Sequence, residues 1–169
     1  MLYTSAEANK LLKLLRDDLE SLRLEEEQTC TFVAATVEHP EDVRPEYNFE
    51  EMQQKIKEQE DKIRKVKHAM NLFNTTHTLP GSKTTIDEAL VLIPQLTAKK
   101  AKLSKMCNRQ PKARKRPAYG EKTNYIEYEY ANYDIAEARS MYASVSDELA
   151  FLQLGLDKVN TTETMEIEI

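Results

Sequence analysis

The stretch that decides the fold runs from Phe49 to Phe73 and reads FEEMQQKIKEQEDKIRKVKHAMNLF. Its apolar residues recur at steps of three and four and at one step of seven; they are Phe49, Met52, Ile56, Ile63, Val66, Met70 and Phe73. This spacing places them in one narrow stripe along a helix, which is typical of a coiled-coil seam. Gln59 takes the missing seam position, where a single polar residue can fix the register of packed helices. We predict a helix over 48–73 that needs a partner to cover its stripe.

The same period recurs in two other segments, about 4–28 and 133–160, and pairs such as Thr4 with Glu7 and Thr85 with Glu88 are capping boxes that mark helix starts. The predicted helices cover about 4–28, 48–73, 85–106 and 133–160, and Pro94 should kink or divide the third. Narrow seams are buried when helices pack on one another. We therefore expect an all-α fold in the main: a long antiparallel hairpin or coiled-coil bundle of three to four helices, with 1–169 forming a single domain.

Two segments alternate with a period of two, which indicates strands. Residues 123–131 place Ile126, Tyr128 and Tyr130 on one side, and the C-terminal tail from Met165 to Ile169 alternates as a candidate edge strand. Residues 29–37 are rich in β-branched side chains, so they form either a short strand or a continuation of the first helix.

The composition narrows the class of protein. The chain has 169 residues, a net charge of −5 and only three glycines, which leaves no glycine-rich phosphate loop. Its two cysteines provide no disulfide framework. No apolar run reaches 18 residues and residues 1–10 lack a signal-peptide pattern, so we expect a cytoplasmic protein. Because a thin bundle buries little area per residue, we expect a homo-oligomer.

The charges are strongly segregated along the chain. Residues 1–61 hold 16 acidic and 7 basic side chains. Residues 62–122 hold 3 acidic and 15 basic side chains, and residues 123–169 hold 10 acidic and 2 basic ones. The basic middle either pairs with the acidic flanks, within or between subunits, or forms a pocket for an anion. The net negative charge argues against a dedicated DNA-binding protein.

The basic residues 108–122, predicted to be a loop, lead into the tyrosine-rich strand segment. Arginine binds phosphate through two parallel hydrogen bonds, lysine adds charge, and tyrosine offers a face on which a base stacks. This combination predicts a site for a nucleotide-like anion, although an extended single strand of nucleic acid needs the same groups. The candidate ligand-binding residues here are Arg109, Lys112, Arg114, Lys115, Arg116, Tyr119, Lys122, Tyr125 and Tyr128.

A smaller polar cluster lies near the end of the second predicted helix. Asn71 and Asn74 are followed by Thr75 and Thr76. Such residues either satisfy the helix end and the following turn by hydrogen bonds or line the same anion pocket in an oligomer.

The sequence offers no arrangement for catalysis or for a metal. His39, His68 and His77 are far apart, and no HxxxH or CxxC spacing occurs. Serine nucleophile elbows and dinucleotide fingerprints are also absent. We therefore expect no enzymatic activity, no metal and no cofactor.

An asparagine-containing helix end, Asn71-Leu72-Phe73-Asn74-Thr75, precedes a helix start, Thr85-Ile86-Asp87-Glu88-Ala89-Leu90. In these motifs the chain resembles the septicolysin-like family of small bacterial proteins. Tyr125-Ile126-Glu127-Tyr128 and the ending 156–162 are similar too, although the family's arginine–aspartate pair falls at Ile93-Pro94 and Thr161 replaces its tryptophan. The resemblance implies a helical oligomer without an established enzymatic activity.

These observations favour a non-catalytic, homo-oligomeric helical protein that binds and sequesters an anionic, nucleotide-derived small molecule, for example an immune signalling nucleotide. The alternative is a structural or protein-interaction scaffold that holds no small ligand. A third class, an enzyme that hydrolyses a nucleotide, would need catalytic groups brought together only by folding.

Overall fold

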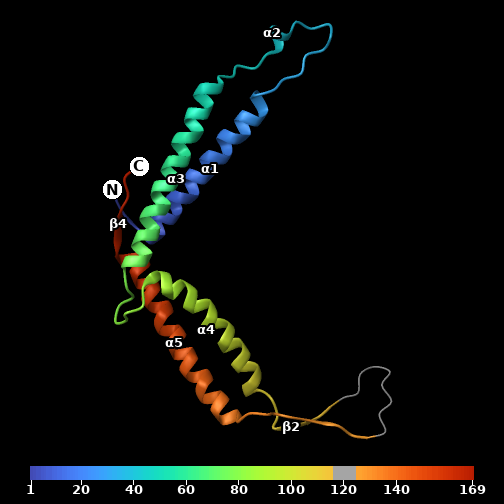
Figure 1. The fold of residues 1–169 in the computed structure, drawn as a ribbon, viewed down its shortest axis with the longest axis vertical. Coiled ribbons are helices and arrows are strands. Elements are labelled where there is room, and N and C mark those ends of the chain that lie inside the picture. Colours follow the sequence, from blue (N-terminus) through green and yellow to red (C-terminus); the bar gives the residue numbers. More distant parts are fainter. Residues whose placement is uncertain (116–124) are drawn as a thin grey trace. The chain divides into compact units, whose positions relative to one another are not determined.

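The computed structural model describes residues 1–115 and 125–169 (Figure 1). In this part of the chain the helices are α1 (Ser5–Thr29), α2 (Pro40–Val43), α3 (Phe49–Thr76), α4 (Ile86–Cys107) and α5 (Ile135–Thr162). The strands are β1 (Leu2–Thr4), β2 (Lys112–Arg114), β3 (Tyr128–Tyr130) and β4 (Thr164–Glu166). The mainly helical fold with small β elements is thus confirmed. The chain divides into two compact units, Met1–Thr78 with Lys158–Ile169 and Leu79–Asp157, while the prediction of a single domain stays a prediction.

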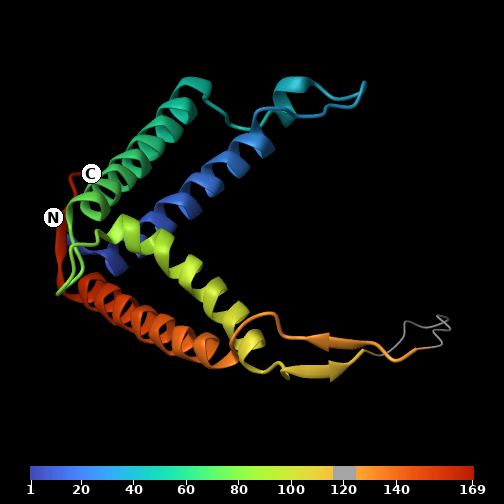
Figure 2. The ribbon, with the colours of Figure 1, turned by 60° about the horizontal axis from the view of Figure 1, so that its bottom comes forward.

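The first unit is built on the antiparallel pair of α1 and α3, which pack side by side (Figures 1 and 2). The buried residues of α3 recur every seven positions and are Met52, Gln59, Val66 and Phe73; those of α1 include Ala8, Leu12 and Leu15. The other predicted seam residues of both helices are half-buried, except Phe49, which is exposed. The predicted seam is therefore the line of contact between these helices.

Gln59 lies in the middle of this seam and is only 8% exposed. Its side-chain amide donates hydrogen bonds to the backbone carbonyl of Leu15 at 3.2 Å and to Oδ2 of Asp18 at 3.3 Å. A buried amide without a partner is destabilising, so these two bonds hold α1 and α3 in one register.

Strands β1 and β4 pair antiparallel in the same unit, with Tyr3 opposite Met165. In the tail Met165 and Ile167 are buried whereas Glu166 and Glu168 are exposed, as the predicted alternation requires, but Ile169 is 49% exposed and the strand ends at Glu166. The strand considered for residues 29–37 is absent: α1 continues to Thr29, and 31–35 have no regular structure. Val33 and Val37 are 93% and 95% exposed, so these β-branched residues have no neighbouring surface on which a strand would pack.

The second unit contains the antiparallel pair of α4 and α5 (Figure 2). Buried residues recur every seven positions on both helices, as Ala89, Leu96 and Leu103 on α4 and Ala138, Val145 and Leu152 on α5. Near the end of α4 and the start of α5 the Tyr133 hydroxyl donates a hydrogen bond to the Met106 carbonyl at 2.8 Å. Helix α4 continues through Pro94, so this residue does not divide it.

The predicted loop 108–122 is wrong at residues 112–114, which form β2 and pair antiparallel with β3. The ladder continues at both ends, from the Lys115 amide to the Glu127 carbonyl at 2.9 Å and from the Ala131 amide to the Pro111 carbonyl at 3.1 Å. The prediction of a strand over 123–131 is confirmed only for Tyr128–Tyr130, and residues 123 and 124 lie outside the described part.

Capping boxes begin α1 and α4, whereas α3 has half of one. Thr4 and Thr85 exchange hydrogen bonds with Glu7 and Glu88 respectively. Asn48 accepts a hydrogen bond from the amide of Glu51 at 3.3 Å.

Replacing Leu12 tests the α1–α3 seam. Leu12 is 7% exposed, so Leu12→Ala should lower the free energy of unfolding by about 2–5 kcal/mol through lost burial and a residual cavity. Leu14 lies on the same helix but is 58% exposed, so Leu14→Ala should change the free energy of unfolding by less than about 0.5 kcal/mol. Urea unfolding followed by circular dichroism measures both; equal effects would contradict the assigned seam.

The capping boxes predict a specific pH dependence of stability. Hydrogen bonds from the Thr4 and Thr85 backbones, and then from their hydroxyls, lower the pKa values of Glu7 and Glu88 below 4.5. A lowered folded-state pKa stabilises the protein above pH 4.5, and this contribution is lost as the pH falls through the folded-state pKa. The double variant Glu7→Gln with Glu88→Gln keeps the caps without their charges. Between about pH 5 and pH 3 its midpoint temperature of thermal unfolding should therefore fall by less than that of the wild type. Parallel declines in the two proteins would refute this.

Candidate anion-binding site

The β2–β3 hairpin brings together most of the predicted ligand-binding residues that the structure describes. Its register places Lys112 opposite Tyr130 and Arg114 opposite Tyr128. Directly opposed residues share one side of an antiparallel pair, so these four side chains lie on one side of the hairpin. We call them the cation–tyrosine face; it consists of Lys112, Arg114, Tyr128 and Tyr130.

Lys112 lies against both aromatic rings of this face. Its Nζ is 4.1 Å from the ring centroid of Tyr128 and 5.4 Å from that of Tyr130, which are cation–π distances. Tyr128 and Tyr130 are nevertheless 46% and 60% exposed. Arg114 is exposed and makes no ion pair within the described part of the chain. The face therefore offers π-surface and positive charge to solvent.

The opposite side of the hairpin is electrically balanced. Arg109 pairs with Glu129 at 2.8 Å, and the Lys115 ammonium pairs with Glu127 at 2.8 Å. These residues point away from the cation–tyrosine face because successive side chains in a strand alternate. Two of the predicted cations, Arg109 and Lys115, thus belong to ion pairs, and the net positive charge is concentrated on the other side.

The remaining predicted residues are placed differently. Tyr125 is exposed three positions before Tyr128, and Arg116, Tyr119 and Lys122 lie outside the described residues. Asn71 and Asn74 lie within the last two turns of α3, in the first unit, whereas the hairpin belongs to the second.

Tyr130 is the member of this face that is missing from the predicted ligand-binding set. The period of two placed it beside Tyr128, but which cations lie opposite depends on the register, which the sequence does not specify.

A small hollow lies beside the hairpin, on the side of the Arg109–Glu129 ion pair. The hollow, lined by Arg109, Gln110, Ala113, Glu129 and Ala131, measures about 70 Å³. Small-molecule pockets usually measure roughly 300–1,000 Å³. This hollow is therefore too small to enclose a nucleotide, and it lies on the ion-paired side of the hairpin, opposite the cation–tyrosine face.

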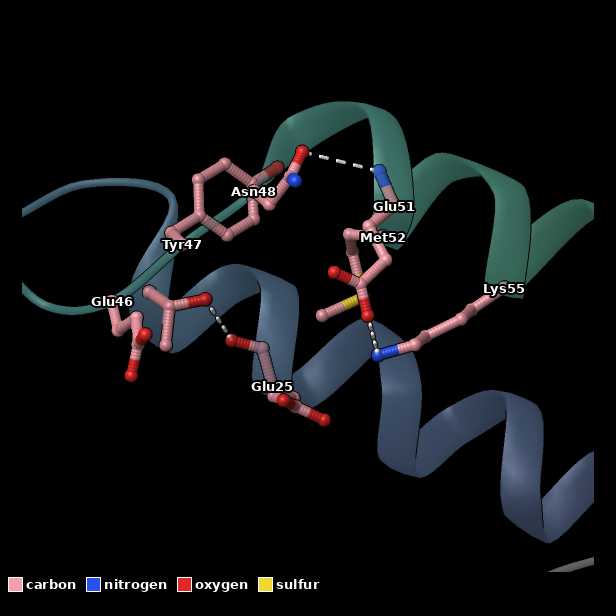
Figure 3. A pocket seen from close by; sticks show the side chains of 8 residues that line it. Glu25, Glu46, Tyr47, Asn48, Glu51, Met52 and Lys55 are labelled. Carbon is pink, nitrogen blue, oxygen red and sulfur yellow. Dashed lines mark hydrogen bonds and ion pairs between the residues drawn. The ribbon is translucent and has the colours of Figure 1, made fainter.

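A larger pocket, of about 450 Å³, lies where α1 ends and α3 begins (Figure 3). Its carboxylates come from Glu25, Glu46 and Glu51, and its one cation, Lys55, pairs with Glu51 at 2.7 Å. The hydrogen bond and charge of Lys55 lower the pKa of Glu51, which keeps that carboxylate ionised. Such a lining repels an anion, so this pocket is a poor candidate for the predicted ligand.

A third hollow, of about 480 Å³, lies between the end of α3 and β4. Phe73 and His77 form one wall, with ring centroids 4.0 Å apart, and Glu166 and Glu168 contribute carboxylates. Its charge is likewise unsuited to an anion. Within the described residues no group of three histidine, cysteine or acidic side chains is placed to hold a metal ion, and no helix there is long and apolar enough to cross a membrane.

Neither a family model nor a curated protein matches the chain. A solved structure with a similar fold is the crystal structure of a functionally unknown conserved protein from Corynebacterium diphtheriae. It is 16% identical, and the alignment covers 98% of this chain and 100% of that chain with a TM-score of 0.56. At this identity the likeness shows the fold alone, and the resemblance to the septicolysin-like family stays a prediction.

Proposed function

We propose that the protein binds an anionic, nucleotide-derived small molecule on the cation–tyrosine face and sequesters it without chemical conversion. The observation that carries this proposal is the β2–β3 register, which gathers Lys112, Arg114, Tyr128 and Tyr130 on one side of the hairpin while Glu127 and Glu129 alternate to the other.

The chemistry of the face suits both parts of a nucleotide. The Arg114 guanidinium presents parallel donors for two phosphate oxygens, and the Lys112 ammonium adds a charge. The exposed rings of Tyr128 and Tyr130 offer stacking surfaces for a base, and base–aromatic stacking contributes about 1–3 kcal/mol per base. Lys112 lies over these rings, so a base that stacks there displaces its ammonium from the ring faces, and the ammonium then turns toward the phosphate.

The role proposed is to hold the ligand rather than to convert it. A general base must come within hydrogen-bond reach of the proton that it abstracts. The carboxylates of Glu127 and Glu129 are ion-paired on the other side of the hairpin. A ligand on the cation–tyrosine face therefore meets cations and phenols from the described residues of the hairpin, but no carboxylate.

Sequestration also requires that the ligand be covered, and here the proposal includes self-association. Tyr128 and Tyr130 of the cation–tyrosine face are exposed to solvent, so a second copy would supply the other wall. Exposed apolar side chains on α4 and α5 give copies a surface on which to associate; they are Leu90, Val91, Met141, Phe151 and Leu154.

The same apolar side chains favour a second candidate function, a protein-interaction scaffold without a small ligand. In that case the charges of the hairpin would serve association itself, by pairing with the acidic segments of another copy.

The double variant Lys112→Gln with Arg114→Gln separates the two functions. If the face binds a nucleotide, affinity for ADP-ribose or cyclic di-AMP should fall at least about tenfold per lost cation, since a hydrogen bond to a charged group contributes roughly 1.5–3 kcal/mol. Sedimentation velocity should show an unchanged oligomer. Isothermal titration with about 50 μM protein detects micromolar affinity.

Arg109→Gln with Lys115→Gln is the matched control, because it removes the same two residue types from the opposite side of the same hairpin. The affinity of this control variant for ADP-ribose or cyclic di-AMP should fall only a few-fold. An oligomer that dissociates in the first variant would support the scaffold instead. Failure of the wild type to bind either nucleotide, or equal losses in both variants, would refute the proposed site.

A further inference from the structure

Between Ala89 and Lys115 the chain contains no aspartate or glutamate. This stretch includes most of α4 and all of β2. Helix α3, in contrast, carries carboxylates along its whole length up to Asp61 and pairs two of its cations with them, Lys55 with Glu51 and Arg64 with Asp61. The lysines of α4 therefore have no carboxylate on their own helix beyond its first turn.

Three of these lysines follow one another at steps of three residues. Lys99, Lys102 and Lys105 are exposed, and none of them makes an ion pair with another described residue. Residues three apart are neighbours on a helix, so the three side chains follow one ridge of α4, which rises about 9 Å along the helix axis while turning through about 120°. Like charges at this spacing destabilise a helix.

The helix dipole accounts for only part of this pattern. Cations in the last turn of a helix are stabilised by its negative end, and Lys105 is in that turn. Lys99 and Lys102 lie earlier, where this effect has fallen off. A polyanion lying along these lysines would relieve their repulsion.

The lysine row leads along the chain into the cation–tyrosine face. Helix α4 ends at Cys107 and β2 begins at Lys112, within one compact unit (Figure 2). We call the whole set the cationic track; its members are Lys99, Lys102, Lys105, Lys112 and Arg114.

We infer that the ligand is a linear single-stranded oligonucleotide, with phosphates on the lysines of α4 and bases on Tyr128 and Tyr130. This inference rests on the proposed function and specifies its ligand class. A stacked strand carries one phosphate per roughly 3.4 Å, so the 9 Å lysine row matches about three phosphates. Stacking on tyrosine requires unpaired bases, which favours a single strand over a duplex.

Isothermal titration with thymidine monophosphate, a thymidine trinucleotide and a thymidine hexanucleotide tests the inference on the full chain. The hexanucleotide should bind at least tenfold more tightly than the monophosphate. Its log affinity should fall against log salt with a slope of roughly −3.5 if all five cations are used, compared with about −1.4 for the hairpin pair alone. Inorganic tripolyphosphate that binds as tightly as the trinucleotide would assign the track to polyphosphate and overturn the inference.

The variant Lys99→Gln with Lys102→Gln removes two cations of the row and keeps good helix-forming residues. It should weaken hexanucleotide binding and reduce the slope by about 1.4, while affinity for the monophosphate is unchanged. Lys10→Gln with Lys13→Gln is the matched control, because these exposed lysines have the same spacing on α1 in the other unit.

Equal effects of the two variants, or equal affinities for the monophosphate and the hexanucleotide, would overturn the inference and leave the proposed function standing. If neither ADP-ribose nor cyclic di-AMP binds, and neither the monophosphate nor the oligonucleotides bind, the proposed function fails together with it.

Discussion

The structure depends on a narrow apolar seam with one fully buried residue in most heptads. On α3 the buried row is Met52, Gln59, Val66 and Phe73, and rows with the same spacing occur on α4 and α5. A stripe this narrow cannot shield a helix from water on its own, so each helix needs an antiparallel partner. Most of each helix then stays exposed, which frees its outer surface to carry charge.

This freedom explains how one chain holds strongly acidic and strongly basic segments without losing its fold. The seam fixes the backbone, while charges on the outside are set by the rest of the sequence. The β2–β3 hairpin repeats the principle on a smaller scale: one side pairs Arg109 and Lys115 with glutamates, and the other keeps Lys112 and Arg114 beside tyrosines. A ligand would meet a face whose charge is not cancelled locally.

Periodicity was sufficient to predict α1, α3 and α5, because burial on a helix leaves a regular signal in the sequence, while the capping box of Thr85 and Glu88 indicated the start of α4. The predicted helix over 48–73 corresponds to Phe49–Thr76, and that over 85–106 to Ile86–Cys107. The β elements were harder. Lys112–Arg114 has no apolar alternation, and it becomes a strand because Tyr128–Tyr130 lies opposite. For the same reason the sequence indicated the cations and tyrosines of the candidate site, whereas the pairs that face each other had to come from the fold.

The amide of Gln59 has a further consequence for the segment that joins α1 to α3. In many hairpins the connection determines how the two arms align, and a change of its length shifts one arm along the other. Here alignment is set midway along the arms, because sliding by one heptad would separate Gln59 from the Leu15 carbonyl. The connector over residues 30–48 therefore does not set the alignment of α1 and α3. Insertions or deletions within it should leave the pairing of these helices intact.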